Sequence, residues 1–511
     1  MRITNSMISR NSMSNMNTNK INVNLLNNQM SSQKKIDRPS EDPVIAIRAL
    51  RLRSNLNELN QYYERNIPDA ESWMEVTESA LSNMKDILTT IRTQCDAGAN
   101  DPLTAEDRSA ILKNLQFLRQ QVYAESNADY AGRSVFTGYK TNTTMTFLKD
   151  EQDIKYSIKE PVSYEDIEEK SYYSNIVTVP TDPTVITGGI DVPDMPQEIP
   201  NKRIRLSYED LGDLTADGIK YIDQDGNEVS LDGYTYIDAD GNQQTVSVRT
   251  DIDYNTWVQG GYQVADDEVI YLQETGELIL GKDIANQMSS EKMELTVSYT
   301  KQGFKEGELR PEHYFDCQNI TDPANVIEYT KKNQEISYTI AFNQKLVVNT
   351  QGSDAFNMNI GRDVDDLTNA VEAAIAAHDK VDKIKDMMKE TQYSDPASQE
   401  GLKQWLEAAE KEADYADDNM QRLYSRGIGK FDGYLSDVVL ATTDLGSRAD
   451  RLLLTKNRMS NQQATYEQLK SSNEDKELSD IIIEYTSAYT AYQASLQASS
   501  KANGQTLLNY L

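Results

Sequence analysis

Histidine and cysteine, which serve in much acid–base, nucleophilic and metal chemistry, are scarce in this sequence. It holds two histidines, His313 in "PEHYF" and His378 in "IAAHDK", and two cysteines, Cys95 and Cys317. No His-Glu-x-x-His, Cys-x-x-Cys, P-loop or Gly-x-Ser-x-Gly string accompanies them, and these are the spacings that zinc, redox, phosphate and serine chemistry require. We therefore predict no enzyme activity and no cofactor. We interpret His378 as a solvated helix residue and His313 as structural, and nothing in the spacing favours a Cys95–Cys317 disulfide.

Two near-copies, "YIDQDGNEVS" and "YIDADGNQQT", resemble the start of a calcium-binding loop. Such a loop needs a bidentate glutamate at its twelfth position. Counted from Asp223, that position is Tyr234. Counted from Asp238, it is Arg249. Asp-Gly-Asn between strand-like residues instead favours a β-hairpin turn, so we predict two hairpins and no metal site.

The composition excludes several classes of partner. The 511 residues carry 51 basic and 82 acidic side chains, a net charge of −31, and phosphate binding needs the opposite sign. Acidic clusters such as "EDIEE" and "ADDE" are interpreted as solvated surface. The sequence contains no stretch of 18 apolar residues, so it predicts no membrane helix. Its first 36 residues are rich in Asn and Ser and lack the pattern of a secretory signal. We therefore expect no nucleic acid and no membrane partner.

The N-terminal part predicts long helices. In "RPSEDP", Ser40 or Asp42 can cap a helix, and Pro43 suits its first turn. Pro68 should kink or divide that helix. A second helix is expected from about Ala105, running back along the first. The apolar or near-apolar positions of the first helix alternate spacings of four and three, with one stutter near Ala70. They are Leu52, Leu56, Leu59, Tyr63, Asn66, Ala70, Met74, Thr77, Leu81, Met84, Leu88, Ile91 and Cys95.

The C-terminal part has the same character. Helical spacing runs through 367–388 and 402–423, which predicts an extra antiparallel pair. Residues 447–503 contain neither glycine nor proline and would extend about 85 Å if fully helical. A stripe from Leu478 to Leu496 is expected to pack against a helix formed by residues 1–36. Burying its large side chains gives ~8–15 kcal/mol gross, less than the cost of ordering roughly 60 residues at ~1–2 kcal/mol each, so both termini should be unfolded in the free monomer.

The segment between these arms is different. Residues 141–340 hold 8 of the 13 prolines and 13 of the 24 glycines, and its tyrosines are interpreted as strand core, with a carbohydrate-binding face as the alternative. The predicted fold class is mixed and mainly α: a long antiparallel helical bundle or coiled coil from both chain ends, with a β-rich middle insert. The predicted domains are a terminal coiled coil (1–40 and 471–511), a helical rod (41–140 and 334–470) and a solvent-exposed insert of one or two subdomains (141–333).

Several strings resemble the flagellin superfamily. They are "MRITNSMI", "NNQMSSQKKIDRPSEDP", "AEDRSAILKNLQFLRQQVYAESNADYAGRSVFTGYKT" and the final stretch from "DLGSRADRLLL" to "LLNYL". Within the superfamily, "PSEDP" and "GRSVFTGYKT" are most similar to the junction proteins that join hook to filament. The resemblance covers about 1–145 and 335–511 and does not extend to 146–333.

The resemblance implies a structural role in the bacterial flagellum. It implies terminal helices in the inner tube, a variable segment facing solvent, and unfolded export through the type III apparatus to an extracellular hook–filament junction. The implied partners are identical subunits in a ring, a neighbouring hook-associated protein, flagellin and an export chaperone. The residues to which the resemblance assigns assembly and chaperone binding are Ile481, Ile482, Tyr485, Tyr489, Tyr492 and Leu496.

Two other functions remain open from the sequence. The chain could be a flagellin that polymerises into the filament itself, which the copy number per flagellum would distinguish. It could instead be a surface adhesin whose middle insert binds a glycan or a host surface.

Overall fold

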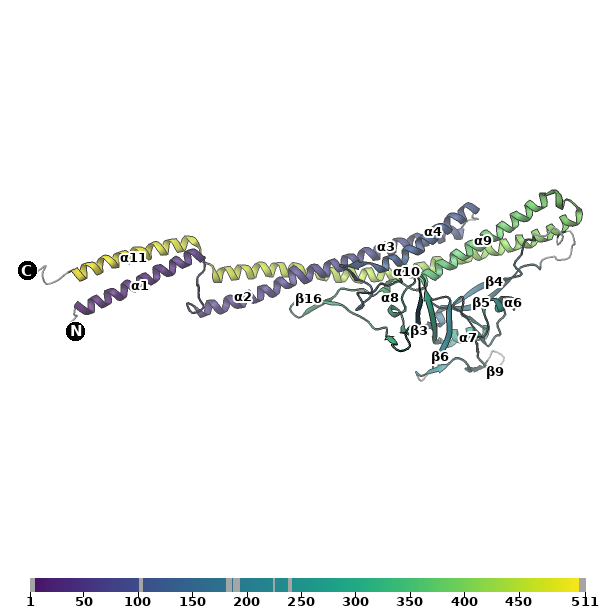
Figure 1. Ribbon diagram of the computed structural model, residues 1–511, viewed down its shortest axis with the longest axis horizontal. Coiled ribbons are helices and arrows are strands. Elements are labelled where there is room, and N and C mark those ends of the chain that lie inside the picture. Colours follow the sequence, from purple (N-terminus) through teal and green to yellow (C-terminus); the bar gives the residue numbers. More distant parts are fainter. Residues whose placement is uncertain are drawn as a thin grey trace, which may run out of the picture. The chain divides into compact units, whose positions relative to one another are not determined.

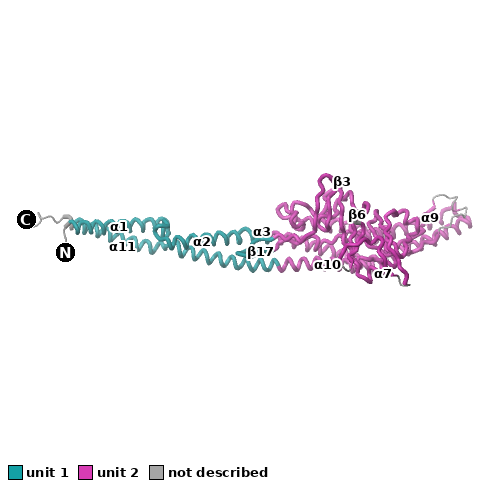
Figure 2. The backbone as a smooth tube through the Cα atoms, turned by 90° about the horizontal axis from the view of Figure 1, so that it is seen from below, with its two compact units in different colours: residues 1–71, 337–346, 448–511 teal, residues 72–336, 347–447 magenta. Residues whose placement is uncertain are grey.

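The computed structural model of this chain forms two compact units (Figures 1 and 2). Unit 1 comprises residues 1–71, 337–346 and 448–511, and unit 2 comprises residues 72–336 and 347–447. The residues that the structure describes are 5–100, 104–180, 186, 194–223, 226–237 and 241–504. Asp238 of the second calcium-like string and the final "LLNYL" lie outside the described residues.

Unit 1 is built mainly from helices that come from both ends of the sequence. Its elements are α1 (Asn5–Ser32), α2 (Pro43–Gln61), the π-helix η1 (Tyr62–Asn66), the start of α3 (Ile67–Asn100), β16 (Ser337–Ala341), most of β17 (Gln344–Val347), the end of α10 (Pro396–Glu474) and α11 (Leu478–Gly504). Helix α1 packs against α11, and α2 lies along the last part of α10, as the Gln463 amide shows by donating to Asn60 at 3.0 Å.

The start of α2 follows the sequence prediction. The Asp42 carboxylate accepts hydrogen bonds from the backbone N–H groups of Val44 and Ile45, at 2.9 and 3.1 Å, and Pro43 occupies the first turn. Between Asp42 and Ser40, the aspartate is therefore the cap.

Pro68 does not divide the helix as predicted. The five residues before Ile67 form the π-helix η1, in which the Ile67 N–H bonds to the Tyr62 carbonyl, five residues back. A π turn accommodates one extra residue in the helix, and it moves the preceding carbonyls relative to the proline ring. The helix thus continues through Pro68 into α3.

A small hairpin, β16–β17, lies on the π-helix, in the part of the chain assigned from the sequence to the rod domain. The Asn66 amide donates to the Thr339 carbonyl at 2.8 Å, and the Tyr338 hydroxyl donates to Asp69 at 2.5 Å. This hairpin fits the sequence analysis, in which helical spacing returns only after these residues; the "SYTIA" and "QKLV" strands pair across a two-residue turn.

The run 447–503, which lacks glycine and proline, is not one continuous helix. Helix α10 ends at Glu474 and α11 begins at Leu478. The Glu474 carbonyl accepts from the Lys35 N–H at 2.8 Å, and the Lys476 N–H donates to the Gln33 carbonyl at 3.0 Å. These bonds to the chain after α1 replace helical hydrogen bonds, so the backbone can change direction without leaving its polar groups unpaired.

Unit 2 contains the β-rich insert, which is organised in two main sheets (Figure 1). A six-stranded sheet has the order β15-β14-β3-β13-β6-β7, and a five-stranded sheet has the order β10-β11-β12-β5-β4. The strands are β3 (Glu151–Ser163), β4 (Ile167–Ser174), β5 (Gln197–Arg205), β6 (Leu211–Ile222), β7 (Glu228–Ser230), β10 (Ser247–Arg249), β11 (Glu268–Leu272), β12 (Glu277–Leu280), β13 (Glu294–Phe304), β14 (Asp316–Asn319) and β15 (Ile327–Tyr329). Smaller pairs are β1 (Asp129–Tyr130) with β2 (Arg133–Ser134), and β8 (Thr235–Ile237) with β9 (Gln243–Thr245).

Both Asp-Gly-Asn strings join paired strands, β6 to β7 and β8 to β9. In the first, the Asn227 N–H donates to the Asp223 carboxylate at 2.8 Å, and Gly226 has a φ of +83°, a conformation that glycine adopts without strain. The hairpin prediction is confirmed for these strands.

The helices of unit 2 include the predicted extra pair. Helix α9 (Asn359–Lys389) and the first part of α10 follow each other across a short turn, and α9 packs against α4 (Ala105–Ala124). The shorter helices are α6 (Tyr254–Gln259), α7 (Lys282–Glu291) and α8 (Gly352–Ala355). With helices from both chain ends and a strand-rich middle, the predicted fold class is confirmed.

Aromatic side chains fill the core of the five-stranded sheet. The Tyr172 ring stacks on Tyr262 with centroids 5.3 Å apart and meets Trp257 edge to face at 4.7 Å, and Ile270 and Ile279 complete the cluster. The interpretation of the insert tyrosines as strand core holds for these residues.

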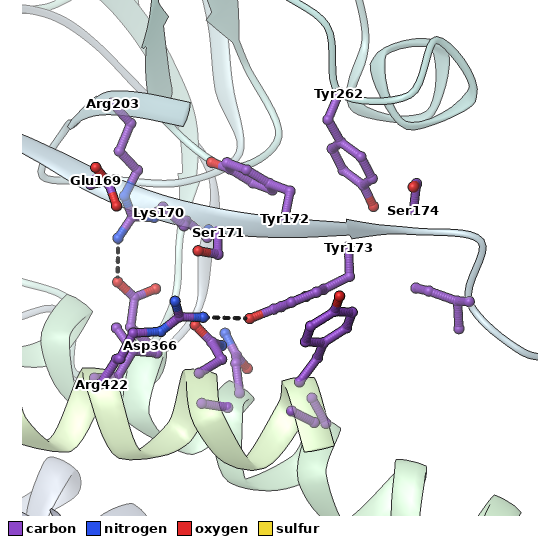
Figure 3. Close-up of a pocket in the computed structure, with 18 of the residues that line it drawn as sticks. Glu169, Lys170, Ser171, Tyr172, Tyr173, Ser174, Arg203, Tyr262, Asp366 and Arg422 are labelled. Carbon is purple, nitrogen blue, oxygen red and sulfur yellow. Dashed lines mark hydrogen bonds and ion pairs between the residues drawn. The ribbon is translucent and has the colours of Figure 1, made fainter. Parts of the chain in front are cut away.

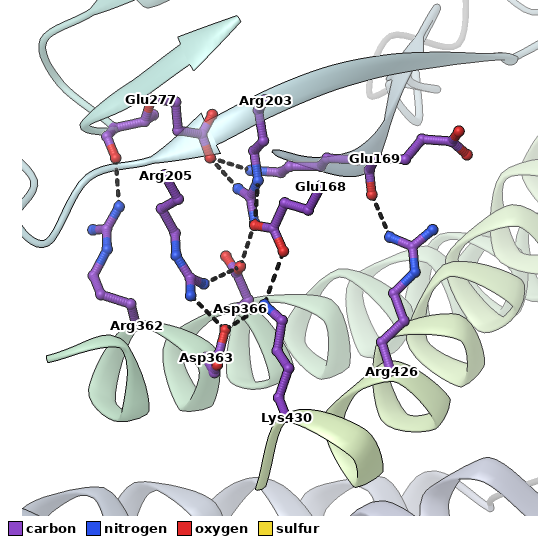
Figure 4. Close-up of polar contacts among 12 residues, drawn as sticks. Glu168, Glu169, Arg203, Arg205, Glu277, Arg362, Asp363, Asp366, Arg426 and Lys430 are labelled. Atoms are coloured by element: carbon purple, nitrogen blue, oxygen red, sulfur yellow. Dashed lines mark hydrogen bonds and ion pairs between the residues drawn. The ribbon is translucent and has the colours of Figure 1, made fainter. Parts of the chain in front are cut away.

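A buried charge cluster joins the five-stranded sheet to α9 and α10 (Figure 4). Arg203 of β5 contacts Glu168 of β4 at 2.7 Å and Asp366 of α9 at 2.6 Å. Arg205 contacts the same Asp366 at 2.7 Å, and Lys430 of α10 reaches Glu168 at 2.8 Å. Such pairs are costly to break once buried, so they fix the insert on the helical pair.

Candidate assembly surface

The pair formed by α1 and α11 has a narrow seam. The two helices run antiparallel, because the chain just after α1 is hydrogen-bonded to the chain just before α11. Side chains that are buried or half-buried recur every three or four residues on each helix, as in a coiled coil. On α1 they are Ser9, Ser12, Met16, Asn19, Val23, Leu26, Gln29 and Met30, and on α11 they are Ile481, Tyr485, Ala488, Tyr492, Ser495 and Ser499. Many of them are small or polar, so the seam buries little apolar surface.

Polar contacts, which we call the polar joint, hold the helix pair together where α1 ends and α11 begins. Arg53 of α2 makes a two-pronged contact with Glu474, at 2.8 and 2.6 Å, and Lys34 pairs with Asp475. The hydrogen bond from Arg53 lowers the pKa of Glu474, and the one from Lys34 lowers the pKa of Asp475. The Gln29 amide also donates to the Lys35 carbonyl at 2.7 Å. The joint therefore depends on charged carboxylates.

Large apolar side chains lie on the outside of the pair, and we call them the outer apolar face. They are Met7, Ile8, Met13, Ile21, Leu25, Leu478, Ile482, Ile483, Tyr489 and Leu496, each between 37% and 68% exposed. Contiguous exposed apolar surface marks interaction sites in soluble proteins. A helix pair with a polar seam and an apolar exterior is suited to burial among other helices.

The structure divides the six predicted assembly residues between two faces of α11. Ile481 is fully buried, and Tyr485 and Tyr492 are half-buried in the seam. Ile482, Tyr489 and Leu496 are exposed on the outer apolar face. The predicted packing of this segment against the N-terminal helix is confirmed, but its residues are only partly correct. Of the stripe from Leu478 to Leu496, only Tyr485 and Tyr492 lie in the seam, together with Ile481 and Ala488.

Further exposed apolar residues of unit 1 were missed by the sequence analysis. They are Val44, Ile47 and Leu50 on α2 and Leu453, Leu454 and Leu469 on α10, all at least 50% exposed. The spacing of three between Val44, Ile47 and Leu50 was a usable signal, because it forms a second stripe beside the buried Ala46 and Ala49. The apolar surface available for contacts thus extends beyond the terminal helices.

The two histidines and two cysteines lie in positions where they contribute to the fold. Burial lowers the pKa of His313 to about 4, and its ring lies 3.3 Å from the Thr144 carbonyl. His378 is not simply solvated as predicted, since its Nε2 lies 2.8 Å from Asp417 of α10. Cys95 and Cys317 are free and buried, with pKa values raised by burial to about 12.

In the described part of the chain, no group of three or more His, Cys, Asp or Glu side chains is arranged to hold a metal ion. Among the helices described, none combines the length and the apolar character that crossing a membrane requires.

Comparison with known proteins identifies the class of the N-terminal part. Residues 3–141 match the family model for the bacterial flagellin N-terminal helical region. This range covers α1 to α4 and the β1–β2 pair, so the resemblance seen in the sequence is confirmed there.

The relatives include two flagellar proteins. The chain is 32% identical over 117 residues to flagellar hook-associated protein 3 of Salmonella typhimurium, a match that takes in 23% of this chain and 37% of that protein. It is 28% identical over 158 residues to a flagellin of Clostridium tyrobutyricum, covering 31% of this chain and 40% of the relative. The chain thus spans about two fifths of the length of these relatives.

A similar solved structure is that of the flagellar junction protein FlgL from Legionella pneumophila. It aligns with 84% of this chain and all of its own length, at 13% identity and a TM-score of 0.31.

Proposed function

We propose that this protein is a structural component of the bacterial flagellum that joins the hook to the filament. The observation that carries the proposal is the outer apolar face on a helix pair with a small, polar seam. Such a pair gains most of its stability from neighbours, because the seam alone buries little apolar surface. The match of residues 3–141 to the flagellin region and the similarity to hook-associated protein 3 support the flagellar setting.

The mechanism follows from repeated contacts between copies. Identical subunits would bury their outer apolar faces against one another in a ring. One side of the ring would contact a neighbouring hook-associated protein, and the other would offer flagellin a template. No chemical step is needed, so the proposed role is mechanical and not enzymatic, and the protein acts outside the cell after type III export.

The same surface is suited to an export chaperone. Ile482, Tyr489 and Leu496 are exposed when α11 pairs with α1, and Ile481, Tyr485 and Tyr492 become exposed when it does not. A chaperone that holds α11 alone would cover all six residues. The chaperone would thereby keep α11 from premature association before export.

Immunogold electron microscopy of intact cells, with an antibody raised against the insert, tests the location. One labelled band at the hook–filament boundary is expected. Label along the whole filament would contradict the junction role and favour the alternative that this chain is a flagellin, to which the Clostridium tyrobutyricum match gives some support.

Charge substitutions test the assembly surface. Ile482→Asp and Leu496→Asp place a carboxylate where burial is proposed, which costs several kcal/mol when the charge is left unpaired. We expect cells carrying either variant to release filaments while exporting the protein. Gln493→Asp is the matched control, because Gln493 is an exposed polar residue of the same helix. Firm filament attachment with all three variants would refute the assembly role of this face.

A further inference from the structure

Unit 2 contains a pocket between β4 and the helical pair α9–α10 (Figure 3). Its volume is about 280 Å³. Strand β4 is an edge strand of the five-stranded sheet and forms one side of the pocket. Sites for small molecules begin at roughly 300 Å³, so the pocket has room for one small ring.

Tyrosine rings line two sides of the pocket. On the helical side, Tyr173 of β4 and Tyr415 of α10 lie with ring centroids 5.7 Å apart and planes 27° from parallel. On the sheet side, Tyr262 stacks on Tyr172, and Tyr254 also lines the pocket. Figure 3 shows Tyr173 and Tyr262 on opposite sides of β4. Flat, partly apolar walls of this kind suit a ligand with an apolar ring face and polar edges.

Two amide side chains in the pocket have no hydrogen-bond partner among the described residues. Asn369 comes from α9 and Asn419 from α10, and both line the pocket. Their neighbours are already engaged: Arg422 donates to the Tyr173 hydroxyl at 3.2 Å, and Glu412 accepts from the Val177 N–H at 2.8 Å. Each amide can donate two hydrogen bonds and accept two, as a hydroxyl-bearing ligand requires.

The charges around the pocket cancel. Its lining contains four cationic residues (Lys170, Arg203, Arg422 and Arg426) and four acidic residues (Glu168, Glu169, Asp366 and Glu412). Most of the cations are held by contacts within the chain, such as Arg203 with Asp366 and Arg422 with Glu198. Arg426 is hydrogen-bonded to the Glu169 carbonyl. The four cations and four acids leave the lining without net charge, which favours a neutral ligand.

We propose that this pocket binds a neutral pyranose ring, as a free sugar or as one unit of a glycan. The amides of Asn369 and Asn419 hydrogen-bond its hydroxyl groups, and Tyr173 and Tyr415 on the helical side contact the C–H groups of its face. The proposal concerns unit 2 alone and does not depend on the assembly role of the outer apolar face.

The first experiment is a titration of the full chain with neutral sugars, followed by saturation-transfer NMR and calorimetry. The probes are glucose, galactose, mannose and N-acetylglucosamine, together with their β1,4-linked disaccharides. At least one should bind with a Kd on the order of 1 mM or tighter. Absence of binding for every probe at about 10 mM would overturn the proposal.

Variants then locate the binding. Asn419→Ala and Asn369→Ala should each weaken the bound sugar by about fivefold to tenfold, because each removes one or two hydrogen bonds. Asn461→Ala is the matched control, since Asn461 is an exposed amide of α10 that does not line the pocket. Circular dichroism confirms that each variant is folded. Equal affinity of all three variants would place the sugar elsewhere and refute the site.

Two further probes separate alternative ligands. Glucuronic acid should bind at least about tenfold more weakly than glucose, because its carboxylate would be buried beside the acidic Glu412. An unstructured peptide that displaced no sugar would agree with the proposal. A peptide that bound at the free edge of β4 while no sugar did would replace the glycan with a strand-adding partner.

Discussion

The backbone of the insert leaves no room for a side chain at Gly276. It precedes β12 with a φ of +62°, and its carbonyl accepts from the Leu206 N–H at 2.8 Å. A Cβ at this position would lie 1.9 Å from the Tyr208 carbonyl oxygen. Gly233 also has a positive φ, of +86°, yet a Cβ there would meet nothing within 4 Å. Substitution of Gly233 would therefore cause backbone strain alone, whereas substitution of Gly276 would add a steric overlap.

We expect Gly276→Ala to destabilise unit 2 by about 3 kcal/mol or more, since backbone must move to relieve the overlap. Gly233→Ala should cost only about 1–2 kcal/mol, the penalty of a left-handed conformation. Urea denaturation followed by tryptophan fluorescence measures both. Equal losses for the two variants would show that the close approach of Tyr208 has no energetic effect.

Glu277 makes the stability of unit 2 dependent on pH. Burial opposes its ionisation, but Arg203 and Lys170 outweigh burial and hold the pKa of Glu277 at about 2, below its ordinary value of 4.5. The carboxylate therefore stabilises the fold above pH 4.5, and this contribution is lost as the pH falls from 4.5 towards 2. Glu168 is expected to act in the same range, because its pKa is also about 2.

Glu277→Gln should remove about 3–5 kcal/mol at pH 7, because Arg203 then lacks one buried partner. The variant should also lose less stability than the unaltered protein between pH 4.5 and 2. Thermal denaturation across this range is the measurement. Glu228→Gln is the control, since that exposed residue lies 3.6 Å from Lys220 and should have little effect. A pH dependence unchanged by Glu277→Gln would contradict this assignment.

At the scale of elements, α1 and α11 should be the least stable helices of the free monomer. Their seam contains Ser9, Ser12, Asn19, Ser495 and Ser499, and the outer apolar face gains nothing until other subunits cover it. Hydrogen exchange of the monomer should therefore be fast in both helices and slow in α3, whose Trp73 and Leu88 are fully buried. Protection of α1 and α11 equal to that of α3 would show that the pair is stable alone.

Sequence periodicity predicted most helices but not the orientation of α11. The first arm was correct because its apolar positions, from Leu56 to Cys95, form one stripe with polar residues on either side. In α11, Ile481, Ile482 and Ile483 are consecutive, so periodicity cannot decide which of them faces α1. The π-helix before Pro68 coincides with the stutter in the apolar spacing near Ala70, because a π turn adds one residue to the helix. The stutter alone does not say whether the helix divides or contains a π turn.

At the scale of the whole molecule, the assembly residues and the insert belong to different units. The outer apolar face lies in unit 1, and the strands from β3 to β15 lie in unit 2. The division of the chain into a terminal coiled coil, a rod and an insert stays a prediction, since the two compact units group the residues differently.

Deletion of residues 146–333, with Asp363→Asn and Asp366→Asn to replace carboxylates that lose their arginines, should leave filament attachment intact. The outer apolar face does not include any deleted residue. Motility assays and electron microscopy of cells carrying the shortened chain provide the measurement. Loss of attachment by a chain that is still exported and helical would assign the insert a part in assembly. Loss of surface binding alone would favour the adhesin function.

The buried charge cluster and the pocket could not be predicted from the sequence, because they are formed by residues far apart in the chain. The acidic clusters of the insert were interpreted as solvated surface, but Glu168 belongs to the buried charge cluster. Its partners are Arg203 and Lys430, and no local pattern connects residues so far apart. The pocket was equally hidden, because Asn369 and Asn419 meet only when α9 and α10 lie against β4.

The two buried cysteine thiols can report which part of unit 2 opens first. Cys95 of α3 and Cys317 of β14 are buried, and burial raises both pKa values to about 12, so neither reacts with a thiol reagent while its surroundings stay closed. Once a segment opens, its cysteine becomes modifiable at the ordinary rate. Mass spectrometry of partly labelled chains would therefore reveal whether the helical layer or the sheet of unit 2 opens first, without any engineered probe.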